Sequence, residues 1–173
     1  MQKLHSRGLL FGASVTVTKE NADEVLSDLF LEELSAGGCS AIIYVEYVPV
    51  DPQSAGLALD EGTRDRMAWR LNVARSCHEN LLLLSFPGDE KNSGGCLAAG
   101  RGFFHINAFG GAEPCPFSPY SDRSVVDASL REVLQSPLFQ KLQCQGSLMQ
   151  EHIGGCVLFA QEAQVKMLLE EPT

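Results

Sequence analysis

The chain has 173 residues, of which 45% are hydrophobic and 20% are charged, which is enough apolar material for a folded core and argues against a disordered polypeptide. Its 13 basic and 22 acidic residues give a formal net charge of −9, which argues against a nucleic-acid-binding protein and against binding to an anionic membrane surface. No apolar run approaches the roughly 20 residues of a membrane-spanning helix. We therefore expect a soluble globular protein, and a cytoplasmic one, because no signal-peptide cleavage site follows the short apolar segment near the amino terminus.

The first half of the chain alternates between strand and helix patterns. Apolar and β-branched residues predict strands over 8–18, 41–50 and 81–86, and helical spacing of apolar residues predicts helices over 21–36 and 63–77. The first of these helices is expected to start with Asn21 as its capping residue. Alternation at these spacings predicts parallel crossovers, hence an open α/β sheet or part of a (β/α) barrel.

The second half has a different character, with recurring glycines and with prolines on both sides of Cys115. We expect a β-hairpin with strands over 103–106 and 108–109, and helices over 129–134 and 157–170. The change near residue 90 predicts two domains, over residues 1–90 and 91–173.

Six cysteines are more than packing alone requires. In a reducing cytoplasm they are expected to be free, and to serve metal binding, catalysis or simple burial. Cys39 and Cys77 lie beside apolar strand or helix positions, which favours burial as small hydrophobic residues. The remaining four are Cys96, Cys115, Cys144 and Cys156.

Three of these cysteines have glycine or proline neighbours. Gly-Gly precedes both Cys96 and Cys156, and Cys115 lies between two prolines. Small residues let the backbone approach a bulky ligand and leave N–H groups free to point at it. Thiolates hold both iron–sulfur clusters and zinc, but structural zinc sites usually contain close C-x-x-C pairs, which are absent here. The pattern favours an iron–sulfur site and leaves zinc as the alternative.

The segment from Cys96 to Cys115 reads as a cysteine, thirteen residues, a glycine, four residues and a cysteine. It resembles the opening of the auxiliary-cluster domain, of the SPASM or shorter twitch type, at the carboxyl end of many radical S-adenosylmethionine proteins. Ser136-Pro137-Leu138-Phe139 and Gly155-Cys156 are also similar to that family, so the resemblance covers residues 90–170. It implies a small α+β domain with a hairpin and an auxiliary [4Fe-4S] cluster. The first half resembles the later strands of the same family's partial parallel (β/α) barrel, with about three strands.

The chain departs from that family in one decisive respect. No cysteines have the C-x-x-x-C-x-x-C spacing of the loop that holds the S-adenosylmethionine-cleaving cluster. The resemblance therefore implies the carboxyl-terminal portion of such an enzyme, which is not competent alone for cofactor cleavage and would bind S-adenosylmethionine only in a complete barrel. Its expected partner is the missing amino-terminal barrel half, or a second copy that pairs through the edge strand over 8–18.

The resemblance implies that Cys96, Cys115 and Cys156 are the cluster ligands. For the fourth iron the alternatives are Cys144, expected in an exposed loop, or an open position where substrate binds. His105 and His152 are further candidates, although a histidine in a hairpin commonly just bonds to its neighbours.

Ser14, Thr16 and Glu46 lie on strands that would approach the cofactor in a complete barrel, and the plain alternative is polar residues with local hydrogen bonds. Glu46 stands among apolar residues and needs a partner if it is buried. Arg101 would either pair with acidic groups near the cluster or be solvated, and the arginines of the helix over 63–77 are expected to form a solvated face.

Two other classes of function remain open at this point. One is a non-catalytic binding or scaffold module that zinc stabilises. The other is a thiol-dependent enzyme with a single reactive cysteine, for which the sequence shows no His–Asp constellation to activate the thiol. Catalytic residues cannot be named from the sequence.

Overall fold

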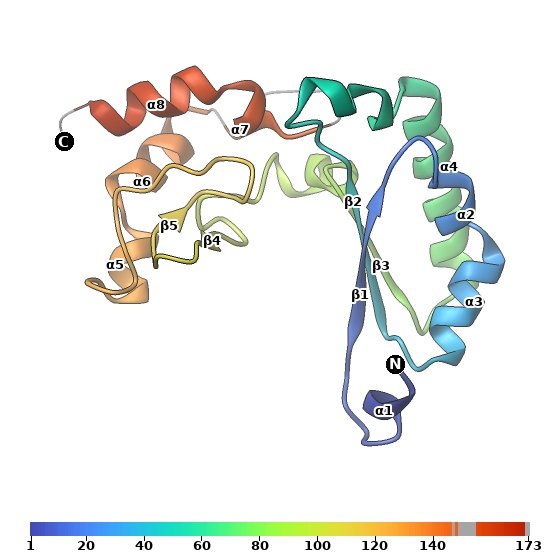
Figure 1. Ribbon diagram of the computed structural model, residues 1–173. Coiled ribbons are helices and arrows are strands. Elements are labelled where there is room, and N and C mark those ends of the chain that lie inside the picture. Colours follow the sequence, from blue (N-terminus) through green and yellow to red (C-terminus); the bar gives the residue numbers. More distant parts are fainter. Residues whose placement is uncertain (147, 149–154, 172–173) are drawn as a thin grey trace. The chain divides into compact units, whose positions relative to one another are not determined.

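The computed structural model describes residues 1–146, 148 and 155–171 (Figure 1). The chain divides into two compact units, the first comprising Met1–Asp89 and the second beginning at Glu90. Each unit surrounds a buried hydrophobic cluster of its own.

The first unit contains a parallel sheet of three strands. In spatial order they are β1 (Gly12–Val17), β2 (Ala41–Glu46) and β3 (Leu82–Phe86), paired in register from their first residues. β-branched and aliphatic residues, which suit the pleated surface of a sheet, dominate these strands. The expected α/β fold with a parallel sheet is therefore confirmed, and the described strands form no closed barrel.

Helices cover one face of this sheet (Figure 1). Between β1 and β2 lie α2 (Ala22–Val25) and α3 (Asp28–Ala36), and between β2 and β3 lies α4 (Glu61–Cys77). The core of the unit fills the space between the helices and this face of the sheet, and its most deeply buried members include Val17, Leu31, Ile42, Tyr44, Leu71 and Leu83.

The expected single helix over 21–36 is two helices, because the caps differ from expectation. The Asn21 side chain does not cap α2, and its Oδ1 instead accepts a hydrogen bond from the Thr18 backbone N–H at 2.8 Å. Ser27 caps α3, since its hydroxyl oxygen accepts from the Phe30 backbone N–H at 3.2 Å. A side-chain cap satisfies a backbone donor that has no partner within the helix, so α3 begins afresh at this serine.

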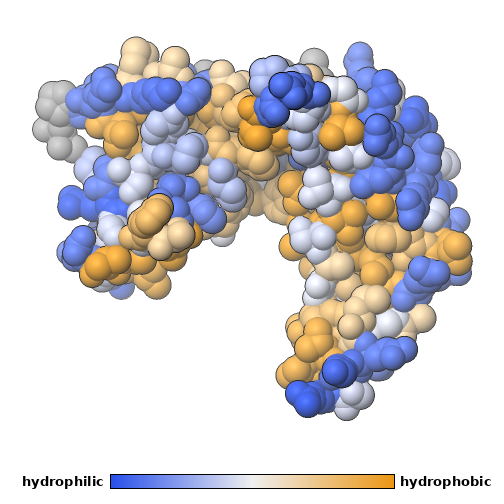
Figure 2. Space-filling view, in the orientation of Figure 1, coloured by the Kyte–Doolittle hydropathy of each residue, from blue (hydrophilic) through white to orange (hydrophobic). Residues whose placement is uncertain are grey.

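The other face of the sheet has none of the described helices of the first unit against it (Figure 1). Ser14 and Thr16 lie on this face, level with Ile43 and Val45 of β2. Leu82 of β3 shares the face and is 56% exposed. Figure 2 shows hydrophobic residues beside hydrophilic ones at the end of the unit that holds α1 (Gln2–His5). The strands therefore leave apolar side chains uncovered within this unit.

Among its described residues, the second unit has an antiparallel strand pair and four α-helices. β4 (His105–Ile106) pairs with β5 (Ala112–Glu113), so the expected hairpin is present but its second strand lies later than 108–109. The helices are α5 (Leu130–Leu134), α6 (Pro137–Cys144), α7 (Val157–Ala160) and α8 (Glu162–Glu170). The expected helix over 157–170 is thus interrupted at Gln161.

Helix α6 was not expected from apolar spacing, yet its start is encoded locally. Ser136 caps it by accepting from the Phe139 backbone N–H at 3.2 Å, and Pro137 takes the first helical position, where its missing N–H is not needed. Phe139 is fully buried and packs against Phe104 with 5.9 Å between ring centroids. This helix therefore forms a wall of the second core.

The described residues also form two 3-10 helices, η1 (Pro52–Leu57) and η2 (Gly88–Ser93). In the part of the chain that the structure describes, no helix is both long enough and apolar enough to span a bilayer.

Candidate metal centre

Three of the six cysteines come together in the buried cluster of the second unit. Cys96 follows η2, Cys115 follows β5, and Cys156 is the N-cap residue of α7. Cys96 and Cys115 are buried and Cys156 is partly exposed. Because 41 positions separate the last two, only the tertiary structure brings these thiols to one place.

Two of the three thiols are in direct contact. The Sγ atoms of Cys115 and Cys156 lie 3.8 Å apart, and Cys96 is near enough to both for electrostatic interaction. Among the described residues, no group of three or more His, Cys, Asp or Glu side chains has the arrangement of a bound metal ion. The site is therefore a thiol pair with a third thiol beside it.

Backbone N–H groups that follow each cysteine act to lower the pKa of its thiol, against the effect of burial. They belong to Ala98 for Cys96, to Phe117 for Cys115, and to Phe159 and Leu158 for Cys156. Such groups favour the thiolate over the thiol, and hydrogen bonds from them are the interactions through which a protein tunes metal-bound sulfur. Backbone groups of three separate loops thus favour negative sulfur.

Without a metal, the surroundings of the thiols control where protons reside. Burial raises the pKa of Cys96 to about 12. The hydrogen bond between the Cys115 and Cys156 thiols, in which either sulfur can be the donor, acts together with burial to raise the pKa of Cys115 far above its ordinary value. The same bond lowers the pKa of Cys156. A bound cation would displace these protons, since thiolates are the metal-binding form.

A carboxylate that the sequence analysis did not single out lies beside these cysteines. Glu90, in η2, is only 8% exposed. Its negative charge acts on both Cys96 and Cys156. The available signal was an acidic residue six positions before a cysteine that two glycines precede.

Arg101 fixes the backbone that leads into Cys96. Its guanidinium donates to the carbonyl oxygen of Cys96 at 2.7 Å and to those of Ser93 and Gly94 at 3.2 Å each. The expectations for this arginine were pairing with acidic groups or solvation, and its described contacts are instead with backbone carbonyls. It therefore holds the loop between η2 and Cys96 in a defined conformation.

The other three cysteines are not members of the buried cluster of the second unit. Cys144 is exposed and is the last residue of α6, not a loop residue as expected. Cys39 is buried in the first unit and donates to the Ala41 carbonyl at 3.1 Å, as expected of a packing residue. The expected burial of Cys77 is wrong, because α4 ends at this residue, beyond the last buried position at Ala74.

The two histidines considered as ligands have different outcomes. His105 of β4 lies opposite Glu113 of β5, with its Nε2 atom 3.9 Å from the carboxylate. This contact corresponds to the plain alternative of a histidine that interacts with its hairpin neighbour. His152 lies outside the described residues.

The structure does not bring Glu46 together with Ser14 and Thr16. In the register of β1 and β2, Glu46 pairs with Val17 and so points to the helix-covered face, whereas Ser14 and Thr16 are on the uncovered face. Glu46 is 6% exposed, and its Oε1 accepts from the Arg64 Nε at 2.6 Å. The carboxylate therefore has the partner that burial demands, and that partner is a residue of α4.

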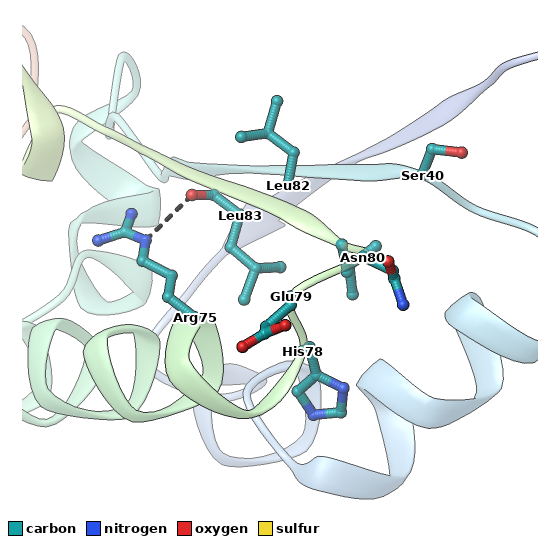
Figure 3. Close-up of a pocket in the computed structure, with 8 residues that line it drawn as sticks. Ser40, Arg75, His78, Glu79, Asn80, Leu82 and Leu83 are labelled. Atoms are coloured by element: carbon teal, nitrogen blue, oxygen red, sulfur yellow. Dashed lines mark hydrogen bonds between the residues drawn. The ribbon is translucent and has the colours of Figure 1, made fainter.

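The arginines of α4 were expected to form a solvated face, and this expectation is wrong for three of them. Arg64 binds Glu46 and Arg70 binds the Leu26 carbonyl, at 3.1 Å from Nη2. Arg75 reaches the Leu83 carbonyl at 3.1 Å, as Figure 3 shows. These side chains tie the helix to neighbouring elements.

Figure 3 also shows a shallow pocket on the first unit. Its lining consists of Ser40, Arg75, His78, Glu79, Asn80, Leu81, Leu82 and Leu83. The Arg75 guanidinium there is already engaged, since it also pairs with Asp89 at 2.7 Å. The pocket lies where β3 begins, whereas parallel α/β sheets bind ligands beyond the carboxyl ends of their strands. We therefore do not take it for the functional site.

Comparison with protein-family models, with curated proteins and with solved structures finds no match to this chain.

Proposed function

We propose that the second unit binds a [4Fe-4S] cluster through Cys96, Cys115 and Cys156, as an auxiliary centre for electron transfer or substrate contact. The observation that supports this most directly is the convergence of the three cysteines in one buried cluster. At each cysteine, backbone N–H groups that follow it in the chain favour the thiolate. Such hydrogen bonds stabilise cluster sulfur and set reduction potentials.

The backbone before two of the thiols depends on glycine. Gly94 and Gly95, before Cys96, have φ angles of +71° and +100°, which glycine adopts without a Cβ penalty. Gly155, before Cys156, has φ +66° and no atom within 4 Å of the position of a Cβ. A cluster, in which each thiolate binds its own iron, would separate the Cys115 and Cys156 sulfurs, which are 3.8 Å apart.

We propose further that the first unit is part of a (β/α) barrel. Strands in chain order with the helices on one face support this, because a doubly wound sheet has helices on both faces. The uncovered face with Ser14 and Thr16 would then be the barrel interior, and S-adenosylmethionine would bind only after completion of the barrel. Glu46 has no part in that site, because it is committed to Arg64 on the helix-covered side.

The edge strand β1 is the proposed contact for the missing amino-terminal barrel half or for a second copy. The exposed Leu9 and Leu10, just before β1, add apolar surface for such a contact. Sedimentation of the purified chain tests this proposal. A single monomeric species at high protein concentration would contradict association through this edge.

A zinc site is the second candidate, and one observation favours it. Two thiolates at about 2.3 Å from one tetrahedral ion stand roughly 3.8 Å apart. The Cys115 and Cys156 sulfurs are separated by 3.8 Å. Under this alternative the second unit is a binding or scaffold module that the metal stabilises, with no redox role. In either case the described cysteines are all free, as is usual in the reducing cytoplasm where we place the protein.

Metal analysis distinguishes the two candidates. Iron, sulfide and zinc per chain are measured after anaerobic reconstitution of the wild type and of Cys96→Ala, Cys115→Ala and Cys156→Ala. Cys77→Ala and Cys144→Ala, at exposed positions, are the matched controls. We expect about four irons per chain in the wild type and the controls, the content of a cubane, and loss of iron in each of the three test variants.

Three other outcomes have definite meanings. Zinc that only the three test variants lose would establish the zinc module. Iron that is indifferent to all three substitutions would refute the proposed ligands. Loss of iron in Cys144→Ala would add Cys144 to the ligand set and would mean that α6 rearranges on binding.

A further inference from the structure

Cys115 and Cys156 place two free thiols in contact within the second unit. Their sulfur atoms are 3.8 Å apart, whereas the sulfurs of a disulfide are separated by about 2.05 Å. An approach of about 1.8 Å, the difference between these distances, would therefore bring them to bonding distance. Among the described cysteines, this is the pair whose sulfurs are in contact. The two residues are 41 positions apart, so the fold and not the local sequence makes the pair.

The backbone constrains one of these cysteines more than the other. Cys115 lies between two prolines, whose φ angles are fixed, and its carbonyl oxygen accepts from the Ser118 N–H at 3.0 Å. Cys156 instead precedes the first turn of α7, and Gly155 before it has no atom within 4 Å of the position of a Cβ. The sulfurs can therefore approach by movement at Cys156, while the backbone at Cys115 stays in place.

The two thiols also differ in their access to solvent. Cys156 is partly exposed, whereas Cys115 is only 3% exposed. A small oxidant therefore reaches the Cys156 sulfur first, and the Cys115 thiol is already in contact with it. An accessible thiol with a second thiol beside it is the arrangement of redox-sensing cysteines, in which the second thiol resolves the oxidised first one.

We propose that Cys115 and Cys156 form a reversible disulfide in response to peroxide. In the first step the Cys156 sulfur attacks hydrogen peroxide, the O–O bond breaks, a sulfenic acid forms on Cys156, and one water leaves with the proton of that thiol. In the second step the Cys115 sulfur attacks the sulfenic sulfur, the S–O bond breaks, the S–S bond forms, and the oxygen leaves as a second water with the proton of Cys115. The two sulfurs together lose two electrons, which the peroxide gains. Exchange with a thiol reductant reverses the bond.

The disulfide and a metal compete for the same two sulfurs. A metal is bound by thiolates, which a disulfide does not contain. Oxidation would therefore remove two of the three proposed cysteine ligands at once, whether the metal group is an iron–sulfur cluster or zinc. The pairing of the thiols does not depend on the proposed function, whereas this control of metal occupancy rests on it.

The experiment uses the full chain, purified in reductant, treated with a chelator and exposed to hydrogen peroxide at a low molar ratio. Remaining thiols are blocked with N-ethylmaleimide, and disulfide-linked peptides are identified by mass spectrometry. The same oxidation in concentrated urea is the control for the unfolded chain, in which Cys144 competes because it closes a smaller loop with Cys156. Cys115→Ser and Cys156→Ser test the two roles, and Cys96→Ser is the matched control, because Cys96 is the third cysteine of the same buried cluster.

We expect the folded wild type to lose two hydrogen atoms in mass and to yield a peptide in which Cys115 is linked to Cys156. Cys96→Ser should form the same link, and Cys156→Ser should not form it. Cys115→Ser should accumulate a sulfenic acid on Cys156, which dimedone traps. Wild type that is oxidised before reconstitution should take up neither iron nor zinc, and dithiothreitol should restore uptake to the level of protein that was never oxidised.

The outcomes separate this inference from the proposed function. A chain that circular dichroism shows to be folded, and that forms no intrachain disulfide or links Cys144 to Cys156 instead, would overturn the pairing. Equal metal uptake by disulfide-linked and reduced chains would overturn the control of metal occupancy. A reduced wild type that takes up neither iron nor zinc would refute the proposed function, while the linked peptide would still establish the disulfide between Cys115 and Cys156.

Discussion

Tyr44 offers the sharpest quantitative test of the first unit's core. Its side chain is fully buried in β2, and its hydroxyl donates to the Val25 carbonyl oxygen at 2.8 Å. Tyr44→Phe removes the donor and leaves that carbonyl without the tyrosine bond. A buried polar group left without its partner costs about 1–3 kcal/mol, so the variant should lose stability by that amount at neutral pH.

The pH dependence of the free energy of unfolding gives a second, independent test of Tyr44. Burial raises the pKa of Tyr44 to about 12, whereas an unfolded tyrosine titrates near 10. The folded state thus prefers the neutral phenol, and this contribution is complete below pH 10 and is lost as the pH rises toward 12. Between pH 8 and pH 11 the wild type should lose about 1.4 kcal/mol through this group, and Tyr44→Phe should lose none of it.

Urea unfolding of both proteins at pH 8 and pH 11, under reducing conditions, measures both effects. Every other titrating group is common to the two proteins and cancels in the difference. The stability gap between wild type and variant should therefore narrow by about 1.4 kcal/mol at the higher pH. A gap that stays constant between the two pH values would refute the argument that burial controls this phenol.

Three further predictions concern stability, each measured as the free energy of unfolding in urea. Arg64→Leu should lower the free energy of unfolding by about 3 kcal/mol, and by more than Glu46→Gln does, because it leaves the buried Glu46 carboxylate without its ion-pair partner. Equal losses in the two variants would contradict a buried ion pair. Ser129→Ala removes the capping box of α5 and should cost about 1 kcal/mol, so an unchanged midpoint would argue against that cap. Gly100→Ala should cost more stability than Gly146→Ala. Both glycines have positive φ angles, +79° and +73°, which cost an alanine about 1–2 kcal/mol of backbone strain, but only at Gly100 would the new Cβ also meet a leucine methyl, at 2.9 Å. A larger loss in Gly146→Ala would be inconsistent with this packing.

Local signals accounted for much of the secondary structure. The start of α5 at Ser129 and the three parallel strands follow from side-chain caps and apolar runs, which involve residues close together in sequence. The error in the expected start of the first helix also concerned residues close together in sequence. Asn21 was expected to cap a helix and binds Thr18 instead, because an asparagine side chain can satisfy either of two nearby backbone N–H groups.

The choice of Glu46 as a cofactor residue shows where sequence reasoning ends. The period of two along a strand places Ser14 and Thr16 on one face of β1, but it does not relate that face to any residue of β2. The pairing of Val17 with Glu46 decides the question, and a shift of one residue would have reversed it. Register depends on packing across the whole sheet, which no short segment contains.

The sequence by itself determined that Cys96, Cys115 and Cys156 differ from the other cysteines, because glycine and proline neighbours act on the backbone at each position separately. Only the tertiary structure decided that the sulfurs of Cys115 and Cys156 lie 3.8 Å apart and that the charge of Glu90 acts on Cys96 and Cys156. The physical reason is the separation along the sequence over which each interaction acts. Backbone conformation responds to the nearest few residues, whereas a cluster of thiols and a carboxylate forms only where a shared hydrophobic core brings distant loops together.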